Sequence, residues 1–390
     1  MLLETSFLNL DANASYGVTK EHHVEVADRL GVFCNPSAVH RGGQRARTLL
    51  EEARSQVREL IGACLEDTLI FTSGATEANN AAICGVLSQE SLQKGSVVLY
   101  GLAEHASVMQ PLEWFQSRGK LGLAIPPLML RAGRIEGVEP STVLAAFMAA
   151  NNESGEIFEV QALFQSVKEV APLVHAHCDM VQLLGKQLVA WHDLGAHSAS
   201  MSGHKIGSYP GVGALVIRSG VTLEPFLMGG PQEQRHRAGT ENLPGIVSFG
   251  IMAQKLVSQA GQQSFNMRRV ADQLIARLAG SYFNVRVNFT DAKRRLPNTL
   301  SITVPGVFAD DLVVALDIQG IAVSSGAACA SGKPGSSHVL LAYGFSENEA
   351  RETIRVSVTG NESTDDVERF LKIFSDVVTR MRKKGGRREY

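Results

Sequence analysis

A lysine enclosed by small and hydroxyl-bearing residues is the first candidate for chemistry in this sequence. Lys205 ends the run Ser-Met-Ser-Gly-His-Lys at residues 200–205, and short apolar runs lie on either side, at 197–201 and 214–217. An amine between two buried strands is desolvated, and desolvation lowers its pKa toward the range in which it forms an imine with a carbonyl compound. Because most lysines are solvated surface charges, the run alone leaves the surface alternative open.

A second candidate is a turn suited to a phosphate group. Leu69, Ile70 and Phe71 predict a short buried strand, which is followed by Thr-Ser-Gly-Ala-Thr-Glu-Ala-Asn-Asn at residues 72–80. Backbone N–H groups at the start of a helix bind phosphate well. An ordinary strand-to-helix turn with Thr76 as the N-cap fits the same residues. The stretch alone does not distinguish the two.

Polar clusters follow three further apolar runs, and these runs predict strands at 97–100, 143–150 and 174–178. Segments long enough for helices separate them, which predicts a mostly parallel sheet. In such sheets ligands bind beyond the carboxyl ends of the strands, so we expect the clusters to converge on one crevice. The clusters are Glu104-His105, residues 151–155 and residues 179–182.

The elements that must position these residues can be read from hydrophobic periodicity. A helix is predicted over 41–62, and a long connecting helix over 242–258. A second unit follows, with a helix near 265–279 and strands at 299–304 and 355–358. The first helix has a buried face formed by Ala46, Leu49, Leu50, Ala53, Val57, Leu60 and Ile61. The last helix has one formed by Val367, Phe370, Leu371, Phe374, Val377, Val378 and Met381.

Length and composition limit the classes of protein. The 390 residues are 44% hydrophobic and 19% charged with a formal net charge of −2, which suits a globular protein of two domains and disfavours nucleic acid as the main partner. No run approaches the ~20 apolar residues of a membrane span. The N-terminus lacks the pattern of a signal peptide, and five scattered cysteines show no metal-type spacing. We therefore expect a cytoplasmic protein without disulfides or a metal site.

Taken together, eight short stretches resemble the cysteine desulfurases of the NifS/IscS-like branch, which are pyridoxal-phosphate enzymes of the class-V aminotransferase group. The resemblance runs from about Leu8 to the last helix, and although each stretch is modest alone, eight in order are specific. The stretches are Asn35-Pro36-Ser37 with His40, residues 72–77, Glu104-His105, and residues 151–155, 179–182, 202–205, 239–242 and 324–329.

The resemblance implies an α/β fold, that of the fold-type-I pyridoxal-phosphate-dependent transferases. A large cofactor-binding domain with a mostly parallel sheet flanked by helices would comprise residues 16–258. A smaller α+β domain would comprise residues 1–15 and 259–390 and carry the loop of the catalytic cysteine, at about 324–337.

It also implies roles for the polar clusters around a pyridoxal 5'-phosphate held covalently by Lys205. Lys205 would also move the substrate Cα proton, Asp179 would pair with the pyridinium nitrogen, and Gln182 would bind the ring oxygen. His105 would stack on the ring and help with proton transfer, although a core histidine bonded to backbone is the alternative. The phosphate would be bound by Gly74, Ala75, Thr76, Ser202, His204 and, from the neighbouring subunit of a homodimer, Thr240, which could otherwise be a helix N-cap.

Substrate binding and sulfur transfer are implied for three more residues. Asn152 and Arg355 would hold the substrate carboxylate, because a guanidinium offers it two parallel contacts, with a structural ion pair as the alternative for Arg355. Cys329 lies in a stretch of small residues, 324–337, that buries little apolar surface and is expected to move. Its thiolate would take the substrate sulfur and carry it outward as a persulfide. The other cysteines, apart from Cys34, are expected to be small core residues.

Three segments depart from the family pattern, at residues 12–15, 208–211 and 231–236. None removes an expected catalytic group. We expect these segments to line the site entrance and the dimer edge, and so to affect substrate preference and acceptor choice.

The expected function is conversion of L-cysteine to L-alanine, with sulfur transferred to Cys329 and on to an acceptor protein of unknown identity. Iron–sulfur cluster assembly, tRNA thiolation and DNA phosphorothioation could all draw on this persulfide. One alternative is a β-lyase such as a selenocysteine lyase, in which Cys329 serves only selectivity. Another is a cofactor-binding partner protein with weakened catalysis. No membrane and no direct nucleic-acid binding is expected.

Overall fold

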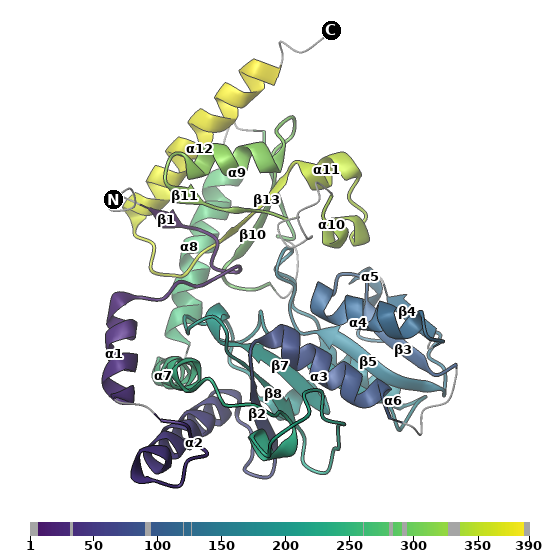
Figure 1. The fold of residues 1–390 in the computed structure, drawn as a ribbon. Helices are drawn as coiled ribbons and strands as arrows, with labels where there is room; N and C mark the ends of the chain where they lie inside the picture. The colour runs from purple at the N-terminus through teal and green to yellow at the C-terminus, as the bar shows by residue number, and fades with distance from the viewer. Residues whose placement is uncertain are drawn as a thin grey trace. The chain divides into compact units, whose positions relative to one another are not determined.

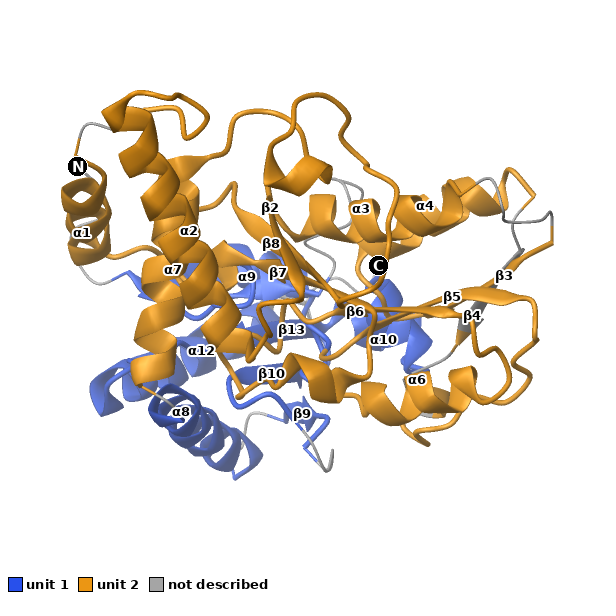
Figure 2. Ribbon diagram, turned by 90° about the horizontal axis from the view of Figure 1, so that it is seen from below, with its two compact units in different colours: residues 1–14, 151–157, 261–390 blue, residues 15–150, 158–260 orange. Residues whose placement is uncertain are grey.

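The computed structural model describes residues 7–31, 34–89, 95–119, 121–125, 127–259, 261–280, 284–290, 295–326 and 336–385. The chain divides into two compact units (Figure 2). Unit 1 comprises residues 1–14, 151–157 and 261–390, and unit 2 comprises residues 15–150 and 158–260. Unit 1 includes residues 151–157, which the sequence predicts as part of the larger domain. These residues belong to unit 1 because they contact it directly: Leu296 N–H donates to the Gly155 carbonyl at 2.7 Å.

Unit 2 is built on a seven-stranded sheet in the order β2-β8-β7-β6-β5-β3-β4 (Figure 1). Only β8 runs against its neighbours, so the other six strands are parallel and share one carboxyl edge. The strands are β2 (Thr68–Thr72), β3 (Val97–Gly101), β4 (Leu121–Ile125), β5 (Thr142–Met148), β6 (His175–Asp179), β7 (Ser198–Ser202) and β8 (Gly213–Ile217).

Successive side chains of a strand point to opposite faces of the sheet, and these strands are apolar on both faces. Helices therefore cover both faces of the sheet. Phe71 of β2 meets Phe249 of α7, and Phe147 of β5 meets Phe164 of α6, with ring centroids 6.5 and 5.6 Å apart. The other face packs on α3 and α4 through a cluster that includes Ile70, Ala78, Ala82, Ile83, Val98, Val108, Leu112, Leu144, Ala146 and Leu215. The helices are α1 (Lys20–Leu30), α2 (Arg41–Ile61), α3 (Ala75–Leu87), α4 (Ala106–Gln116), α5 (Pro127–Leu130), α6 (Val160–Lys168) and α7 (Leu243–Ser258), with short 3₁₀ turns η1 (Trp191–Leu194), η2 (Gly203–Lys205) and η3 (Glu233–Arg235).

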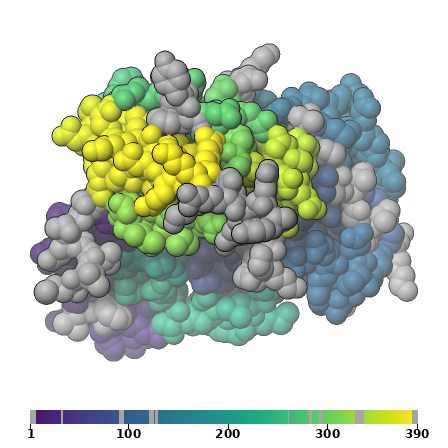
Figure 3. Space-filling view, turned by 90° about the horizontal axis from the view of Figure 1, so that it is seen from above, coloured from purple at the N-terminus to yellow at the C-terminus, as the bar shows by residue number. Residues whose placement is uncertain are grey.

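Unit 1 combines a four-stranded antiparallel sheet, β12-β13-β10-β9, with a small parallel pair, β1 and β11. On the amphipathic α12, the predicted apolar residues are buried except Met381, which is half-buried, and the side of the helix visible in yellow in Figure 3 faces solvent. Its elements are β1 (Leu8–Asn9), α8 (Gln262–Ala279), β9 (Arg286–Asn288), β10 (Thr299–Thr303), α9 (Ala309–Asp317), β11 (Ile321–Ala322), β12 (Ser324–Ser325), α10 (His338–Ala342), α11 (Glu347–Arg351), β13 (Thr353–Ser357) and α12 (Thr364–Gly385).

The structure confirms the predicted fold class and every predicted strand and helix, with boundaries displaced by three residues at most. The apolar runs in the sequence did not predict β4 or the two-residue strands of unit 1. In the described part of the chain, no helix is long and apolar enough to cross a membrane.

One turn in unit 2 is held in an unfavourable backbone conformation by a buried ion pair. Glu233, Gln234 and Arg235 all have positive φ, at 44°, 57° and 70°, which costs about 1–2 kcal/mol per non-glycine residue. The Glu233 carboxylate accepts two hydrogen bonds from the Arg54 guanidinium, at 2.7 and 2.8 Å, and one from Phe71 N–H at 2.8 Å. Both side chains are buried, so these contacts fix the start of the segment that leads to Thr240.

Replacement of Arg54 by methionine should destabilise the protein by about 3–5 kcal/mol, because it leaves the Glu233 carboxylate buried without its cation. Urea unfolding measures this loss. Arg47→Met is the matched control, since it breaks only the exposed Arg47–Glu51 pair of the same helix and should change stability little. An Arg54→Met protein as stable as that control would contradict the structural role assigned to the buried pair.

Candidate active site

The turn between β2 and α3 leaves room above the first turn of the helix. Gly74 is the N-cap of α3, so Thr76 is not, and the N-cap alternative for Thr76 is wrong. A Cβ atom added at Gly74 would meet nothing within 4 Å, whereas one added at Gly213 would lie 2.6 Å from the Gly74 carbonyl carbon. Glycine at 213 therefore lets β8 approach the turn, and glycine at 74 keeps the space over the helix N-terminus open.

The lysine of the first candidate run follows directly from the sheet. Ser202 ends β7, and the 3₁₀ turn η2 holds Gly203, His204 and Lys205. The Ser202 hydroxyl contacts His204 Nδ1 at 2.9 Å. Burial, together with the charge of Lys205, lowers the pKa of His204 to about 4, so this imidazole is neutral at pH 7. Lys205 itself is half-buried rather than fully solvated.

Asp179 lies at the carboxyl end of β6, beside Ser200 of β7 in the strand register. Its carboxylate accepts hydrogen bonds from Val181 N–H at 3.0 Å and from Asn79 Nδ2 at 2.9 Å. Asn79 is fully buried, and its amide also donates to Ser107 and contacts His177 through its oxygen. The sequence reasoning assigned no role to Asn79, although it lies in the 72–80 cluster.

His105 caps α4, and this cap fixes the tautomer of its neutral ring. Its Nδ1 accepts a hydrogen bond from Ser107 N–H at 3.1 Å, so the neutral ring carries its proton on Nε2. The Ser107 hydroxyl lies 2.8 Å from the same Nδ1 and also accepts from Asn79, which connects His105 to Asp179. The alternative prediction, a core histidine bonded to backbone, is thus correct for the bond at Nδ1. The residue is nevertheless half-exposed.

Gln182 has a buried lysine as its partner. Lys186 is 1% exposed, and its ammonium donates to Gln182 Oε1. The amide NH₂ of Gln182 consequently points away from Lys186. The sequence reasoning missed Lys186, although a second lysine four residues after Gln182, in the segment that follows β6, was the available signal.

A pocket of about 960 Å³ contains only part of the predicted phosphate and ring site. Of the predicted residues, Thr76 and His105 line it, together with residues of α3 and α4 and the exposed Phe226. Thr240 is exposed, and the N-cap of α7 is Asn242, so the N-cap alternative for Thr240 is wrong.

The two predicted substrate-binding residues belong to unit 1 and touch each other. Arg355 Nη1 donates to the Asn152 carbonyl at 3.3 Å, and Arg355 Nη2 pairs with Asp11 at 2.6 Å. The ion-pair alternative for Arg355 is therefore present. Arg355 Nε is buried and has no hydrogen-bond partner among the described residues, so the guanidinium keeps one unused donor.

Glu153, in the same 151–155 cluster, is a buried carboxyl whose charge is disfavoured. It accepts a hydrogen bond from the Ser337 hydroxyl, and a Cβ at Gly326 would come within 2.6 Å of its Oε2. Burial raises the pKa of Glu153 to about 7, against the opposing effects of Ser337 and the positive charge of Arg355. Glu153 thus titrates near neutral pH.

The cysteines are only partly as predicted. Cys329 lies outside the described residues, as do residues 327–335 around it. Cys178 is buried and Cys84 half-buried, as expected for core residues. Cys64 is exposed, so its assignment to the core is wrong. It follows the glycine that ends α2 and lies in a turn whose next residue, Leu65, is also exposed.

Comparison with known proteins identifies the family. The aminotransferase class-V family profile matches residues 24–370. Cysteine desulfurase IscS 1 of Archaeoglobus fulgidus is 35% identical over 90% of this chain and 91% of its own length. The solved structure of a NifS-like protein superposes with a TM-score of 0.86 at 28% identity, covering 96% of this chain and all of that one. SspA in complex with cysteine gives a TM-score of 0.75 at 27% identity, covering 92% and 100%.

The chain belongs to the cysteine desulfurases of the class-V aminotransferase family. Pyridoxal phosphate is the cofactor of this family, and the residues at the carboxyl edge of unit 2 fit it. The open α3 N-terminus suits a phosphate. Asp179 presents a carboxylate held by neutral donors, and the buried Ser200 hydroxyl beside it has no hydrogen-bond partner among the described residues.

The raised pKa of Glu153 predicts a pH-dependent stability. The folded protein holds a proton up to about pH 7, whereas the unfolded chain releases it near 4.5, so the free energy of unfolding should fall as pH rises between these values. The loss is roughly 3 kcal/mol, and Glu153→Gln, which keeps the acceptor for Ser337 without the charge, should abolish it. Urea unfolding between pH 5 and 8 measures the difference between the two proteins.

Glu349→Gln is the control for this experiment, because hydrogen bonds from Ser346 and Arg286 lower the pKa of Glu349 to about 2, below the pH window. Its stability relative to the wild type should be independent of pH. A difference between wild type and Glu153→Gln that does not change from pH 5 to 8 would contradict the burial of this carboxyl.

Proposed function

We propose that this cysteine desulfurase converts L-cysteine to L-alanine and transfers the sulfur to Cys329 as a persulfide, which then passes it to an acceptor protein. The observation that carries the proposal is the arrangement at one sheet edge. Asp179 ends β6, Ser202 ends β7, and Lys205 lies in the turn that follows. The cysteine-bound neighbour SspA supports cysteine as the substrate.

The residues of unit 2 would hold pyridoxal phosphate at three points. The N–H groups of residues 74–76, with the hydroxyls of Thr76 and Ser202 and the neutral His204, would bind the phosphate. Asp179 would bind the pyridinium nitrogen and the NH₂ of Gln182 the ring oxygen, which its bond to Lys186 leaves pointing away from that lysine. The cofactor, attached covalently to Lys205, would withdraw electrons from the substrate Cα.

Two residues of unit 2 would handle protons. Lys205 Nζ, once released from the cofactor, would take the proton from the substrate Cα. His105 would stack on the ring face and exchange its proton through Nε2, because Ser107 occupies Nδ1. The chain from Ser107 through Asn79 to Asp179 would hold the ring of His105 in one orientation.

Arg355 and Asn152 would bind the substrate carboxylate. Arg355 has an unused Nε donor, and its Nη2 is paired with Asp11, which is partly exposed and would have to share or yield this contact. The Asn152 carbonyl holds Nη1 and orients the guanidinium. A guanidinium held at two atoms offers a carboxylate a fixed planar partner.

The sulfur step then balances without an added oxidant or reductant. The Cys329 thiolate attacks the substrate sulfur, an S–S bond forms, and the Cβ–S bond breaks with its electron pair left on the substrate carbon. A proton replaces sulfur on that carbon, and alanine leaves. Release of the persulfide sulfur as sulfide requires a thiol reductant or the acceptor protein.

A homodimer would complete the cofactor site. Phe226, Leu227 and Met228 are exposed, and Phe226 lines the same pocket as Thr76 and His105. Exposed apolar residues beside a pocket are typical of an interface between subunits. A second copy covering them would bring its own exposed Thr240 toward the phosphate, as the family's dimers do. We place the reaction in the cytoplasm, where thiols stay reduced.

The persulfide route is tested by incubating the purified protein with L-cysteine. We expect alanine formation, a persulfide on Cys329 by peptide mapping, and a loss of turnover of at least about a hundredfold in Cys329→Ala, since the nucleophile is gone. Cys64→Ala is the control, because Cys64 is an exposed thiol that does not line the pocket of Thr76 and His105. Alanine formed at full rate by Cys329→Ala would refute the route.

Replacing the buried Lys186 and replacing the half-buried Lys205 should have different effects on the bound cofactor. Borohydride reduction should fix it on Lys205, and Lys205→Ala should carry no covalent cofactor. Lys186→Met should keep the label but raise the pH midpoint of the cofactor's visible absorption by about 0.5–1 unit, because Gln182 loses the bond that orients it. Lys168→Met, which removes a lysine bonded to the Gly195 carbonyl, is the control. Label found on Lys186, or an unshifted midpoint, would contradict these assignments.

A further inference from the structure

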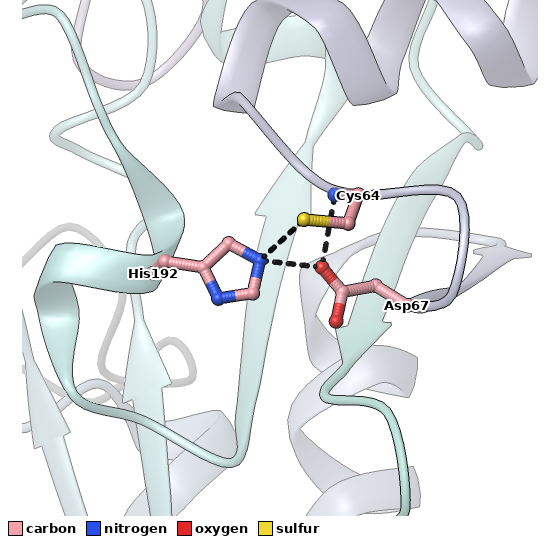
Figure 4. Close-up of side chains that lie close together, drawn as sticks. All are labelled: Cys64, Asp67 and His192. Carbon is pink, nitrogen blue, oxygen red and sulfur yellow. Dashed lines mark hydrogen bonds and ion pairs between the residues drawn. The ribbon is translucent and has the colours of Figure 1, made fainter.

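Three potential metal ligands meet in unit 2 outside the residues used above. The Cys64 thiol, the Asp67 carboxylate and the His192 imidazole place their ligand atoms within 4.8 Å of one another (Figure 4). Cys64 and Asp67 lie in the turn between α2 and β2, and His192 lies in η1. Cys64 Sγ is 3.3 Å from His192 Nε2, and Asp67 Oδ2 is 2.8 Å from the same nitrogen.

Asp67 is fixed in place without help from His192. Its side chain is 1% exposed. Oδ2 accepts hydrogen bonds from Trp191 Nε1 at 2.9 Å and Cys64 N–H at 3.1 Å, and Oδ1 accepts one from Ser219 N–H at 3.1 Å. Donors of this kind orient ligating carboxylates in metal sites.

The geometry does not suit a nucleophile activated by a histidine. In such arrangements the thiol and the carboxylate contact different ring nitrogens, so that the base can take a proton from one and be oriented by the other. Here both converge on Nε2 of His192, as the two dashed lines that begin at the His192 ring in Figure 4 show. One proton on Nε2 cannot be directed at both atoms, whereas a cation between the three would contact all of them.

The separations are close to those of a tetrahedral metal. Zinc bonds of about 2.0–2.3 Å at tetrahedral angles place pairs of ligand atoms about 3.3–3.6 Å apart. The Sγ–Nε2 separation of 3.3 Å would have to open by about 0.2–0.3 Å, and the Nε2–Oδ2 separation of 2.8 Å by about half an ångström. Sγ and Oδ2 lie within 4.8 Å of each other. Cys64 is exposed and His192 is one-third exposed, so both can make this adjustment.

We propose that Cys64, Asp67 and His192 form a surface site for a divalent cation of the Zn²⁺ class, with a water molecule as the fourth ligand. The mixed sulfur, nitrogen and oxygen set favours Zn²⁺ or Co²⁺ over Mg²⁺ and Ca²⁺, which take oxygen ligands. Binding releases the Cys64 thiol proton, and any proton on His192 Nε2, to solvent. The exposed fourth position is open to a ligand atom from outside, as in non-structural zinc sites.

The test uses untagged, cofactor-loaded protein that carries Cys329→Ala, which removes the one reactive thiol of the proposed reaction. Co²⁺ is the probe, because the d–d bands of a tetrahedral Co²⁺ site lie at longer wavelengths than the cofactor's absorption. We expect one Co²⁺ per chain, displaced by Zn²⁺. Cys64→Ala and His192→Ala should each weaken binding by at least about tenfold. Cys84→Ala should bind as tightly as the parent protein.

Alkylation by iodoacetamide gives an independent readout. Zn²⁺ should slow labelling of Cys64 and leave labelling of Cys84 unchanged, as determined by peptide mapping. The proposal is overturned if the parent protein gives no tetrahedral Co²⁺ spectrum. It is equally overturned if Cys64→Ala binds Co²⁺ as tightly as the parent protein, or if Zn²⁺ does not protect Cys64.

Discussion

The polar interior of unit 2 depends on the hydrogen bonds of the Asn79 side-chain amide. It is fully buried, so each of its hydrogen-bonding groups must find a partner inside the protein. Its NH₂ donates to Asp179 and Ser107, and its oxygen contacts His177 Nε2. An aspartate of the same shape would place a second carboxylate 2.9 Å from that of Asp179, so only the amide serves both sides.

This network is possible because His177 is kept neutral. Burial lowers the pKa of His177 to about 3. The neutral ring can donate from Nε2 to Asn79 while its Nδ1 contacts the Ser198 hydroxyl at 2.9 Å. His177 and Asp179 alternate with Cys178 on β6 and therefore face α3 together. The two-residue alternation of side chains along β6 thus places His177 on the same face as the Asp179 carboxylate at the end of the strand.

The sequence predicted well what depends on local pattern and on the shared edge of parallel strands. The predicted strands and helices are present, and the polar residues after β6 and β7 come from neighbouring strands because β6 and β7 pair in parallel register. It could not predict partners chosen by tertiary structure. Asn79 and the Arg54–Glu233 pair have no signal in their own neighbourhoods, since the residues that they contact belong to other elements. For Lys186 the four-residue spacing from Gln182 was a signal, but its burial is a property of the fold. Cys64 was misassigned because apolar neighbours indicate burial in a helix or strand, but not in a turn.

The departures from the family pattern are accommodated by contacts of the same kind. Asn13, in the first departing segment, is buried and donates to the Asn152 carbonyl and the Thr299 hydroxyl, so it supports the residue proposed to bind substrate. Tyr209, in the second, bonds through its hydroxyl to His23 of α1. The third contains Glu233. Asn13, Tyr209 and Glu233 each find a partner elsewhere in their own unit, and the buried Asn13 and Glu233 require one. These side chains therefore anchor each of the three segments within its own unit.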